Sequence, residues 1–149
     1  MICPASVVGP LGADAEDDGI TRLLWGVSGN LTDGPVFAQA RDELAAYFAG
    51  DLQTFTVPLA PRGSAFQLRF YAALCAIPYG ETRTYGDLAA ELGVSAQAIG
   101  QACGANPIAV FIPCHRVLAA NGLGGYSGAG GIEAKVALLR LEGAAGLLL

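Results

Sequence analysis

The sequence predicts a small α/β domain followed by a helical domain. Two short runs that are typical of strands, residues 20–25 and 55–59, lie in the first part of the 149-residue chain. In the rest of the chain, apolar residues recur at the spacing of packed helices. Prolines and a glycine between the two parts indicate a connection. We therefore expect one domain over residues 1–63 and a second over residues 64–149.

One helix is expected in the first domain, over residues 35–50. Its apolar residues follow one another at steps of three and four residues: Phe37, Ala40, Leu44 and Phe48. Gly50 is expected to end this helix, because glycine is common just after the last helical turn. The spacing predicts one face that packs on the rest of the α/β domain.

In the second domain, polar residues mark the starts of successive helices. Ser64 can cap a helix over residues 65–77, and Pro78 would end it. Thr84 and Asp87 have the spacing of a capping box, in which each side chain bonds the backbone of the other. A second helix is therefore expected to begin directly after Thr84.

Two short helices across a tight turn predict a helix-turn-helix. Gly93 would break the helix over residues 85–92, and Ser95 would cap the next one, over residues 96–104. The pattern alone also fits an ordinary helical hairpin. The second of these helices is slim, with small residues on much of its surface: Ala96, Ala98, Gly100, Ala102 and Gly104. Small residues permit close approach of another backbone, either a neighbouring helix or a nucleic acid.

A last helix is expected after a glycine-dense loop. Its core-facing residues are expected to be Ile132, Val136 and Leu139, and Gly143 suits the position just past its end. Glu142 falls in the last turn, where the helix dipole disfavours a negative charge. This carboxylate is either solvated or held there by another group.

The composition limits the classes of function. Hydrophobic residues make up 53% of the chain and charged residues 14%, which favours a folded core over disorder. The longest uncharged span contains prolines and amides and is no membrane helix, and no export signal is evident, so a cytoplasmic protein without membrane contact is expected. The net charge of −5 argues against a simple nucleic-acid binder, although most of the acidic excess lies in the first half.

The four cysteines do not form a metal-binding pattern. They have no CxxC spacing, and the chain has a single histidine, so neither a zinc site nor any other metal or cofactor is predicted. Free thiols in a reducing compartment are the expected state.

The stretch "IPCHRV" places a thiol beside an imidazole. A cysteine reacts as its thiolate, and a base within reach, directly or through one water molecule, activates it. His115 is adjacent to Cys114, but neighbouring side chains on an extended segment point apart. Glu142 is a candidate for the third group that fixes the histidine tautomer. A buried structural cysteine beside a surface histidine is the alternative.

The motifs around this pair occur in a recognisable order. "FQ", "IPYGETRTYGDLA", "AIGQACGANP", "IPCHRV", "GGYSG" and "LLRLEG" resemble the O6-alkylguanine-DNA alkyltransferases, the methylated-DNA–protein-cysteine methyltransferases. The resemblance is close over residues 65–143 and looser over the first half. It implies a small ribonuclease-H-like α/β domain packed on a helical domain that carries the helix-turn-helix and the cysteine.

The resemblance also implies roles for individual residues. Cys114 matches the alkyl acceptor, His115 and Glu142 match its proton relay, and Asn106 matches the asparagine that braces the active-site turn. The residues that match substrate- or DNA-binding positions are Tyr85, Gln97, Arg116, Val117, Tyr126, Ser127 and Lys135. Of these, Arg116 is expected to be mainly structural.

The implied function is DNA repair by irreversible transfer of an alkyl group from guanine O6 to Cys114, once per molecule. The expected partner is double-stranded DNA containing O6-alkylguanine, and the expected state is a monomer. Gln97 stands where the family usually has an arginine, which puts strong DNA binding in question. Two alternatives are a non-enzymatic sensor of alkylated DNA, which would lack the cysteine, and a cysteine hydrolase, which would need an oxyanion hole and turnover.

Overall fold

A computed structural model describes residues 2–3, 11–16, 18–26, 34–126 and 131–144 of the chain. The chain divides into two compact units, Met1–Arg62 and Gly63–Leu149. Among the helices so described, none combines the length and the apolar character needed to cross a membrane.

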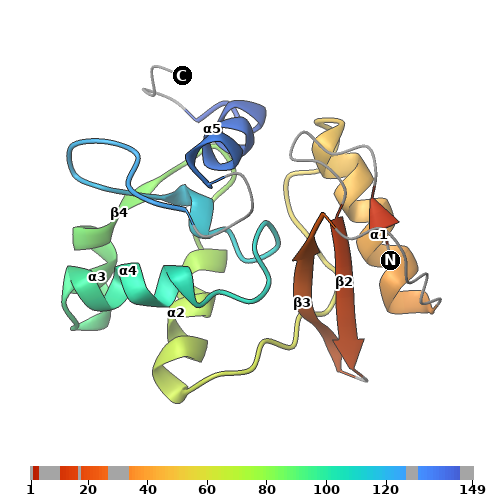
Figure 1. The fold of residues 1–149 in the computed structure, drawn as a ribbon, viewed down its shortest axis with the longest axis horizontal. Helices are drawn as coiled ribbons and strands as arrows, with labels where there is room; N and C mark the ends of the chain where they lie inside the picture. Colours follow the sequence, from red (N-terminus) through yellow and green to blue (C-terminus); the bar gives the residue numbers. More distant parts are fainter. Residues whose placement is uncertain (1, 4–10, 17, 27–33, 127–130, 145–149) are drawn as a thin grey trace. The chain divides into compact units, whose positions relative to one another are not determined.

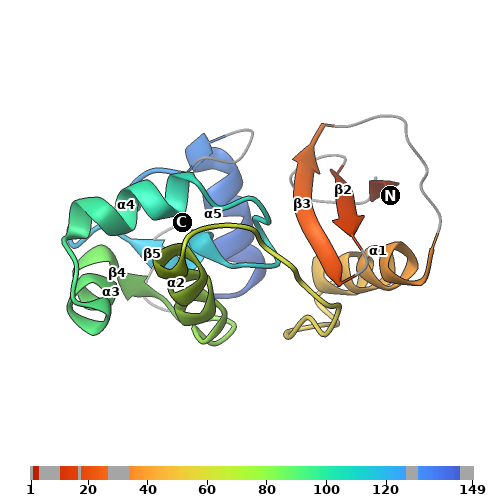
Figure 2. The same ribbon diagram turned by 90° about the horizontal axis from the view of Figure 1, so that it is seen from below.

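In the first unit, the residues that the structure describes form a small antiparallel sheet and one helix. Strands β1 (Ile2–Cys3), β2 (Leu11–Glu16) and β3 (Gly19–Trp25) pair in that order. Helix α1 (Pro35–Phe48) contacts all three strands and lies along the sheet (Figures 1 and 2). The predicted helix and the predicted strand at 20–25 are confirmed. Strand β2 was not predicted, because its small and acidic residues carry no strand signal.

The expected strand over residues 55–59 is wrong. Only Leu59 forms a bridge there, with Ile20 of β3. The Glu43 side chain accepts hydrogen bonds from the backbone N–H groups of Thr56 (2.8 Å) and Val57 (3.0 Å). These two donors are therefore satisfied by a carboxylate instead of by a neighbouring strand.

The second unit is helical. Its described residues form four α-helices: α2 (Ala65–Cys75), α3 (Tyr85–Leu92), α4 (Ala96–Gly104) and α5 (Gly131–Leu141). Two short strands, β4 (Arg83–Thr84) and β5 (Val117–Leu118), pair in parallel. Figure 1 shows α3 and α4 as consecutive helices on one side of this unit, with α5 on another.

The predicted caps of this unit are confirmed. Ser64 opens α2 and Thr84 opens α3, each in a capping box, with Asp87 as the partner of Thr84. The Ser95 hydroxyl accepts a hydrogen bond from the third backbone N–H of α4 (3.1 Å). Gly93 has a φ of 70°, a conformation that favours glycine. The two helices expected of a helix-turn-helix are thus joined by the tight turn that was predicted.

The last helix differs from the prediction on one face. Ile132 was expected in the core but is 41% exposed, whereas Lys135 is fully buried beside Leu138 and Leu139. The lysine can be buried because its ammonium group donates hydrogen bonds to backbone carbonyls. Gly143 has a φ of 64°, which confirms its predicted place just after the helix.

Candidate active site

Cys114 begins a short 3₁₀ helix, η1 (Cys114–Arg116). The expectation of an extended segment is wrong here, because the Arg116 N–H donates to the carbonyl of Pro113 (3.0 Å) and closes a turn. Successive side chains of a 3₁₀ helix are rotated by roughly 120° instead of pointing to opposite sides. Cys114 and His115 are both buried, with exposures of 3% and 0%.

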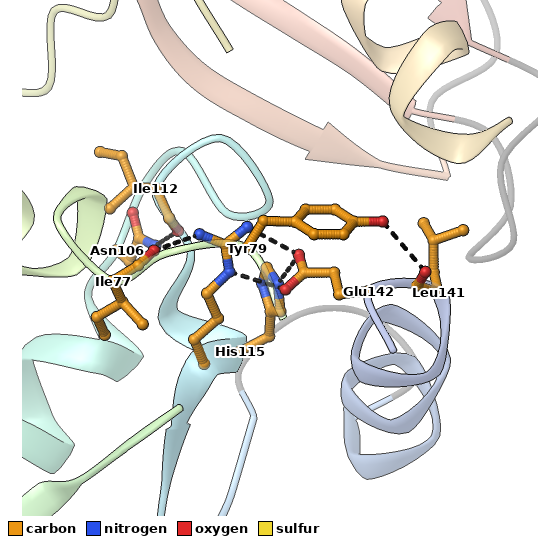
Figure 3. Close-up of polar contacts among 8 residues, drawn as sticks. Ile77, Tyr79, Asn106, Ile112, His115, Leu141 and Glu142 are labelled. Atoms are coloured by element: carbon orange, nitrogen blue, oxygen red, sulfur yellow. Dashed lines mark hydrogen bonds and ion pairs between the residues drawn. The ribbon is translucent and has the colours of Figure 1, made fainter. Parts of the chain in front are cut away.

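Asn106 braces the loop that leads into this turn. Its side-chain amide donates to the carbonyl of Ile112 (2.9 Å), and its side-chain oxygen accepts from the N–H of Ile108 (3.0 Å). Figure 3 shows Asn106 beside Ile112. Within this loop Val110 has a φ of 73°, which is unfavourable for a β-branched residue. The bracing predicted for Asn106 fits these bonds, which hold a strained loop in one shape.

His115 and Glu142 form a buried pair (Figure 3). His115 Nε2 lies 2.7 Å from Glu142 Oε2, and both side chains are fully buried. The other ring nitrogen, Nδ1, is buried without a hydrogen-bond partner among the residues that the structure describes. Of the two states considered for Glu142, solvated or held, the structure shows the second. Its position at the helix end brings it to the imidazole.

The same carboxylate binds Arg116. The Arg116 guanidinium donates from Nε to Glu142 Oε1 (2.8 Å) and from Nη2 to Glu142 Oε2 (3.0 Å). Its Nη1 donates to the carbonyl of Ile77 (2.6 Å). Arg116 therefore connects the turn of Cys114 to the end of α5 and to the segment after α2.

Burial dominates the protonation of the central pair. It raises the pKa of the Cys114 thiol, while a hydrogen bond with Asn106 and the charge of Lys135 oppose the rise. Burial also lowers the pKa of His115, against the opposing effect of Glu142. Both effects favour the neutral forms. The resting pair is thus a thiol beside a neutral imidazole, which is able to accept a proton.

Cys114 lines a cavity of about 390 Å³ within the second unit. The other lining residues come from α3, from α4 and from the segment before α5: Tyr85, Gly100, Cys103, Gly104, Gly125 and Tyr126. Tyrosine rings and glycines provide flat walls and free space. The arrangement can hold a planar group with a substituent near the Cys114 sulfur.

The backbone of Gly124 closely approaches Tyr85. A Cβ added to Gly124 would lie 2.9 Å from the hydroxyl oxygen of Tyr85, and the φ of Gly124 is 71°. The conformation favours glycine at this position, and a larger residue would displace the end of the Tyr85 side chain. The glycine-dense loop thus brings its main chain against the tyrosine that lines the cavity.

Lys135 fixes this loop from inside the unit. Its ammonium group donates to three backbone carbonyls: Val117 (2.6 Å), Leu123 (2.5 Å) and Gly125 (3.0 Å). It also lies 5.9 Å from the centre of the Tyr85 ring, a favourable cation–π distance. The lysine is therefore a clamp that connects α5, β5 and the cavity wall.

The remaining predicted site residues do not line the cavity with their described side chains, although the Val117 carbonyl binds Lys135. Gln97 is exposed on the first turn of α4 and is not among the residues that line the cavity. Val117 is buried at the start of β5. Ser127 lies outside the described residues.

Two residues of the site were not singled out from the sequence. Cys103 shares the cavity with Cys114, and its place between Gly100 and Gly104 on one helix face was the available signal. Tyr79 lies with its ring 5.9 Å from the Arg116 guanidinium and donates its hydroxyl to the carbonyl of Leu141 (3.2 Å). Nothing local in the sequence indicated the contact of Tyr79, which joins residues 62 positions apart.

Models of one protein family match both units of the chain. Residues 65–144 match the model of the 6-O-methylguanine DNA methyltransferase DNA binding domain, and residues 4–61 match that of its ribonuclease-like domain. A methylated-DNA–protein-cysteine methyltransferase of Mycobacterium tuberculosis is 53% identical over 113 residues, which cover 74% of this chain and 67% of the relative. One from Methanosarcina acetivorans is 52% identical over 110 residues, or 72% of this chain and 69% of that protein.

A solved structure shows the same fold. The crystal structure of Mycobacterium tuberculosis OGT in complex with DNA is 45% identical, with a TM-score of 0.80 over 91% of this chain and 87% of that one. The fold class inferred from the sequence, a ribonuclease-like domain followed by a helical domain, is confirmed. The two family models, the relatives and the buried Cys114–His115–Glu142 arrangement lead to one conclusion: the chain belongs to the 6-O-methylguanine DNA methyltransferase family.

Proposed function

We propose that this protein repairs DNA by taking an alkyl group from O6 of guanine onto Cys114, once per molecule. One observation carries the proposal. Cys114 opens on a cavity and is followed by His115, whose Nε2 is held by Glu142 and whose Nδ1 has no partner among the described residues. A nucleophile, a base and a group that orients the base thus occur together.

The reaction is a single displacement at the alkyl carbon. Nδ1 of His115 takes the proton of the Cys114 thiol, directly or through one water molecule, and the sulfur attacks the alkyl carbon. The bond between that carbon and guanine O6 breaks, and its electron pair stays with the guanine. The guanine receives the proton from the imidazolium, so unmodified guanine leaves and a thioether remains. Because the carbon–sulfur bond of a thioether does not readily break, the alkyl group stays on Cys114 and the protein is consumed by the reaction.

The cavity would hold the damaged base after it leaves the duplex. A base inside duplex DNA is out of reach of a buried thiol, so it has to be flipped out. Tyr85 and Tyr126 would contact the base from the cavity walls. The main-chain carbonyls of Cys114 and Val117 would accept from its amino group, and Ser127 would lie near O6. The relative crystallised in complex with DNA supports a DNA substrate for this chain.

Helix α4 would lie against the minor groove. Its small residues allow close approach of the DNA backbone. Gln97, exposed at its start, would occupy the gap left by the flipped base without adding charge. The described site residues all belong to the second unit of one chain, so a monomer on double-stranded DNA suffices for the reaction.

The test is the intact mass of the protein after incubation with a duplex that contains one O6-methylguanine. We expect a gain of one methyl group per molecule and no further repair when more substrate is added. Cys114→Ser should gain none. Cys75→Ser is the matched control, since Cys75 is exposed outside the cavity, and it should react like the parent. Several turnovers per molecule, or methylation of Cys114→Ser, would contradict the proposal.

A further inference from the structure

The guanidinium of Arg116 forms a bidentate ion pair with the carboxylate of Glu142. Nε and Nη2 bond different oxygens of this carboxylate, at 2.8 and 3.0 Å. Paired N–H donors of this kind form strong, charge-assisted hydrogen bonds with a fixed geometry. The guanidinium is itself held by the carbonyl of Ile77 and by the Tyr79 ring. Arg116 is thus fixed in place with its positive charge beside Glu142.

Glu142 consequently serves two partners. Its Oε2 atom lies 2.7 Å from His115 Nε2 and 3.0 Å from Arg116 Nη2. Arginine stays protonated at all accessible pH values. The negative charge of Glu142 is therefore balanced by Arg116 before any proton reaches His115. A carboxylate shared in this way stabilises an imidazolium less than an unshared one does.

Among the described residues, the other titratable groups near this cluster supply no second negative charge at rest. Tyr71 of α2, Tyr79 and Tyr126 interact with Cys114, Arg116 or Glu142, and burial raises their pKa values and that of Cys114. Lys135 of α5 adds a positive charge. Arg116 and Lys135 both act to lower the pKa of His115, in addition to the larger effect of burial and against that of Glu142.

We propose that Arg116 is a positioning residue that keeps His115 neutral, as the tautomer that donates from Nε2 to Glu142 and leaves Nδ1 ready to accept the proton of Cys114. The catalytic half of this inference rests on the proposed alkyl transfer. In that reaction the imidazolium exists only between the removal of the thiol proton and its delivery to guanine. The charge of Arg116 disfavours the imidazolium as a resting state and favours onward transfer of its proton.

The chain has one histidine, so a protein labelled with ¹⁵N-histidine reports on His115 alone. We expect the ring signals of the DNA-free parent to show the Nε2–H tautomer and a titration midpoint below the ordinary value of 6.5. Arg116→Met removes the charge and should raise the midpoint by about one pH unit or more. Arg116→Lys keeps a charge and should leave it near that of the parent.

A midpoint at or above 6.5 in the parent, or the Nδ1–H tautomer, would overturn the inference. So would a folded Arg116→Met variant with an unchanged midpoint. If Arg116→Met fails to fold, the tautomer and midpoint of the parent and of Arg116→Lys still decide the question.

A second measurement separates this inference from the proposed function. The single-turnover rate should fall as the pH drops through the pKa of His115, because only the neutral ring accepts the thiol proton. A higher pKa in Arg116→Met should therefore move this decline to higher pH by the same amount. If the titration midpoint moves and the rate profile does not, His115 is not the base, and its proposed role in the transfer is overturned. The effect of Arg116 on the protonation of His115 would still be supported.

Discussion

Two sides of one cavity each carry a thiol, and the two thiols differ in their surroundings. Cys103 on α4 and Cys114 on η1 line the same space. Burial raises both pKa values, that of Cys103 to about 12. Burial alone therefore does not distinguish the two cysteines. Only Cys114 is followed by a histidine that a carboxylate anchors.

The two sides of the cavity differ in the residues that they provide. The side formed by η1 holds the buried charges, with Glu142 and Arg116 locked by hydrogen bonds of 2.8 and 3.0 Å. The α4 side offers small residues, with Gly100 and Gly104 next to Cys103 in the cavity wall. We infer that the first side sets the rate of transfer and that the second sets which DNA can approach. Substitutions on the two sides should therefore affect different measurements.

The largest expected effect is on the proton relay. Glu142→Gln removes the charge that orients and stabilises the His115 ring, and single-turnover transfer should slow by roughly 10²–10⁴-fold, the usual range for general-base assistance. Binding to alkylated duplex should change little, because Glu142 is buried. Glu133→Gln, an exposed change in α5, the helix that ends just before Glu142, is the control. Rates equal to those of the parent across neutral pH would show that Glu142 is not part of the relay.

A smaller effect is expected on folding when Lys135 is replaced. Lys135→Met keeps the apolar stem but leaves three carbonyls without the ammonium donor. The free energy of unfolding should drop by about 1–3 kcal/mol, the typical cost of orphaned buried polar groups. Urea denaturation measures it, and Arg140→Met, at an exposed position of α5, serves as the control. Equal stability of Lys135→Met and the parent would contradict the clamp assigned to this lysine.

The smallest effect is expected on the α4 side. Gln97→Arg adds one exposed cation, so the slope of log K against log salt for duplex binding should steepen by about 0.9. Affinity for alkylated duplex should rise at low salt, whereas reaction with free O6-benzylguanine should stay the same. An equal change with the free base and with duplex would mean that Gln97 acts on the cavity and not on DNA.

Local signals made much of the second unit predictable. Ser64, Thr84 with Asp87, and Ser95 each cap a helix through bonds within three residues, so the sequence alone contains the information. The same holds for the turn at Gly93. The run at 55–59 has the composition of a strand but does not form one. The backbone N–H groups of Thr56 and Val57 donate to the side chain of Glu43, a contact that the local sequence does not indicate.

The sequence indicated which residues belong to the candidate site better than it indicated how they contact one another. The dipole argument singled out Glu142, and the structure shows it paired with His115. Lys135 is buried because it binds backbone carbonyls, and Arg116 binds the carboxylate of Glu142. Both contacts join distant segments of the chain, which the periodicity of the sequence does not reveal. The helix spacing placed Cys103 on one face with Gly100 and Gly104, but only the fold shows that this face lines the same cavity as Cys114.

The most direct test of the central claim is to map the alkyl group between the two cavity thiols. Protein incubated with an O6-methylguanine duplex is digested, and the peptides of Cys103 and Cys114 are quantified by mass spectrometry. We expect S-methylation of Cys114 in proportion to repair and none on Cys103, although both residues line one cavity. A methyl group on Cys103, or an equal division between the two, would contradict it, because proximity to the substrate and not the His115 relay would then determine the acceptor.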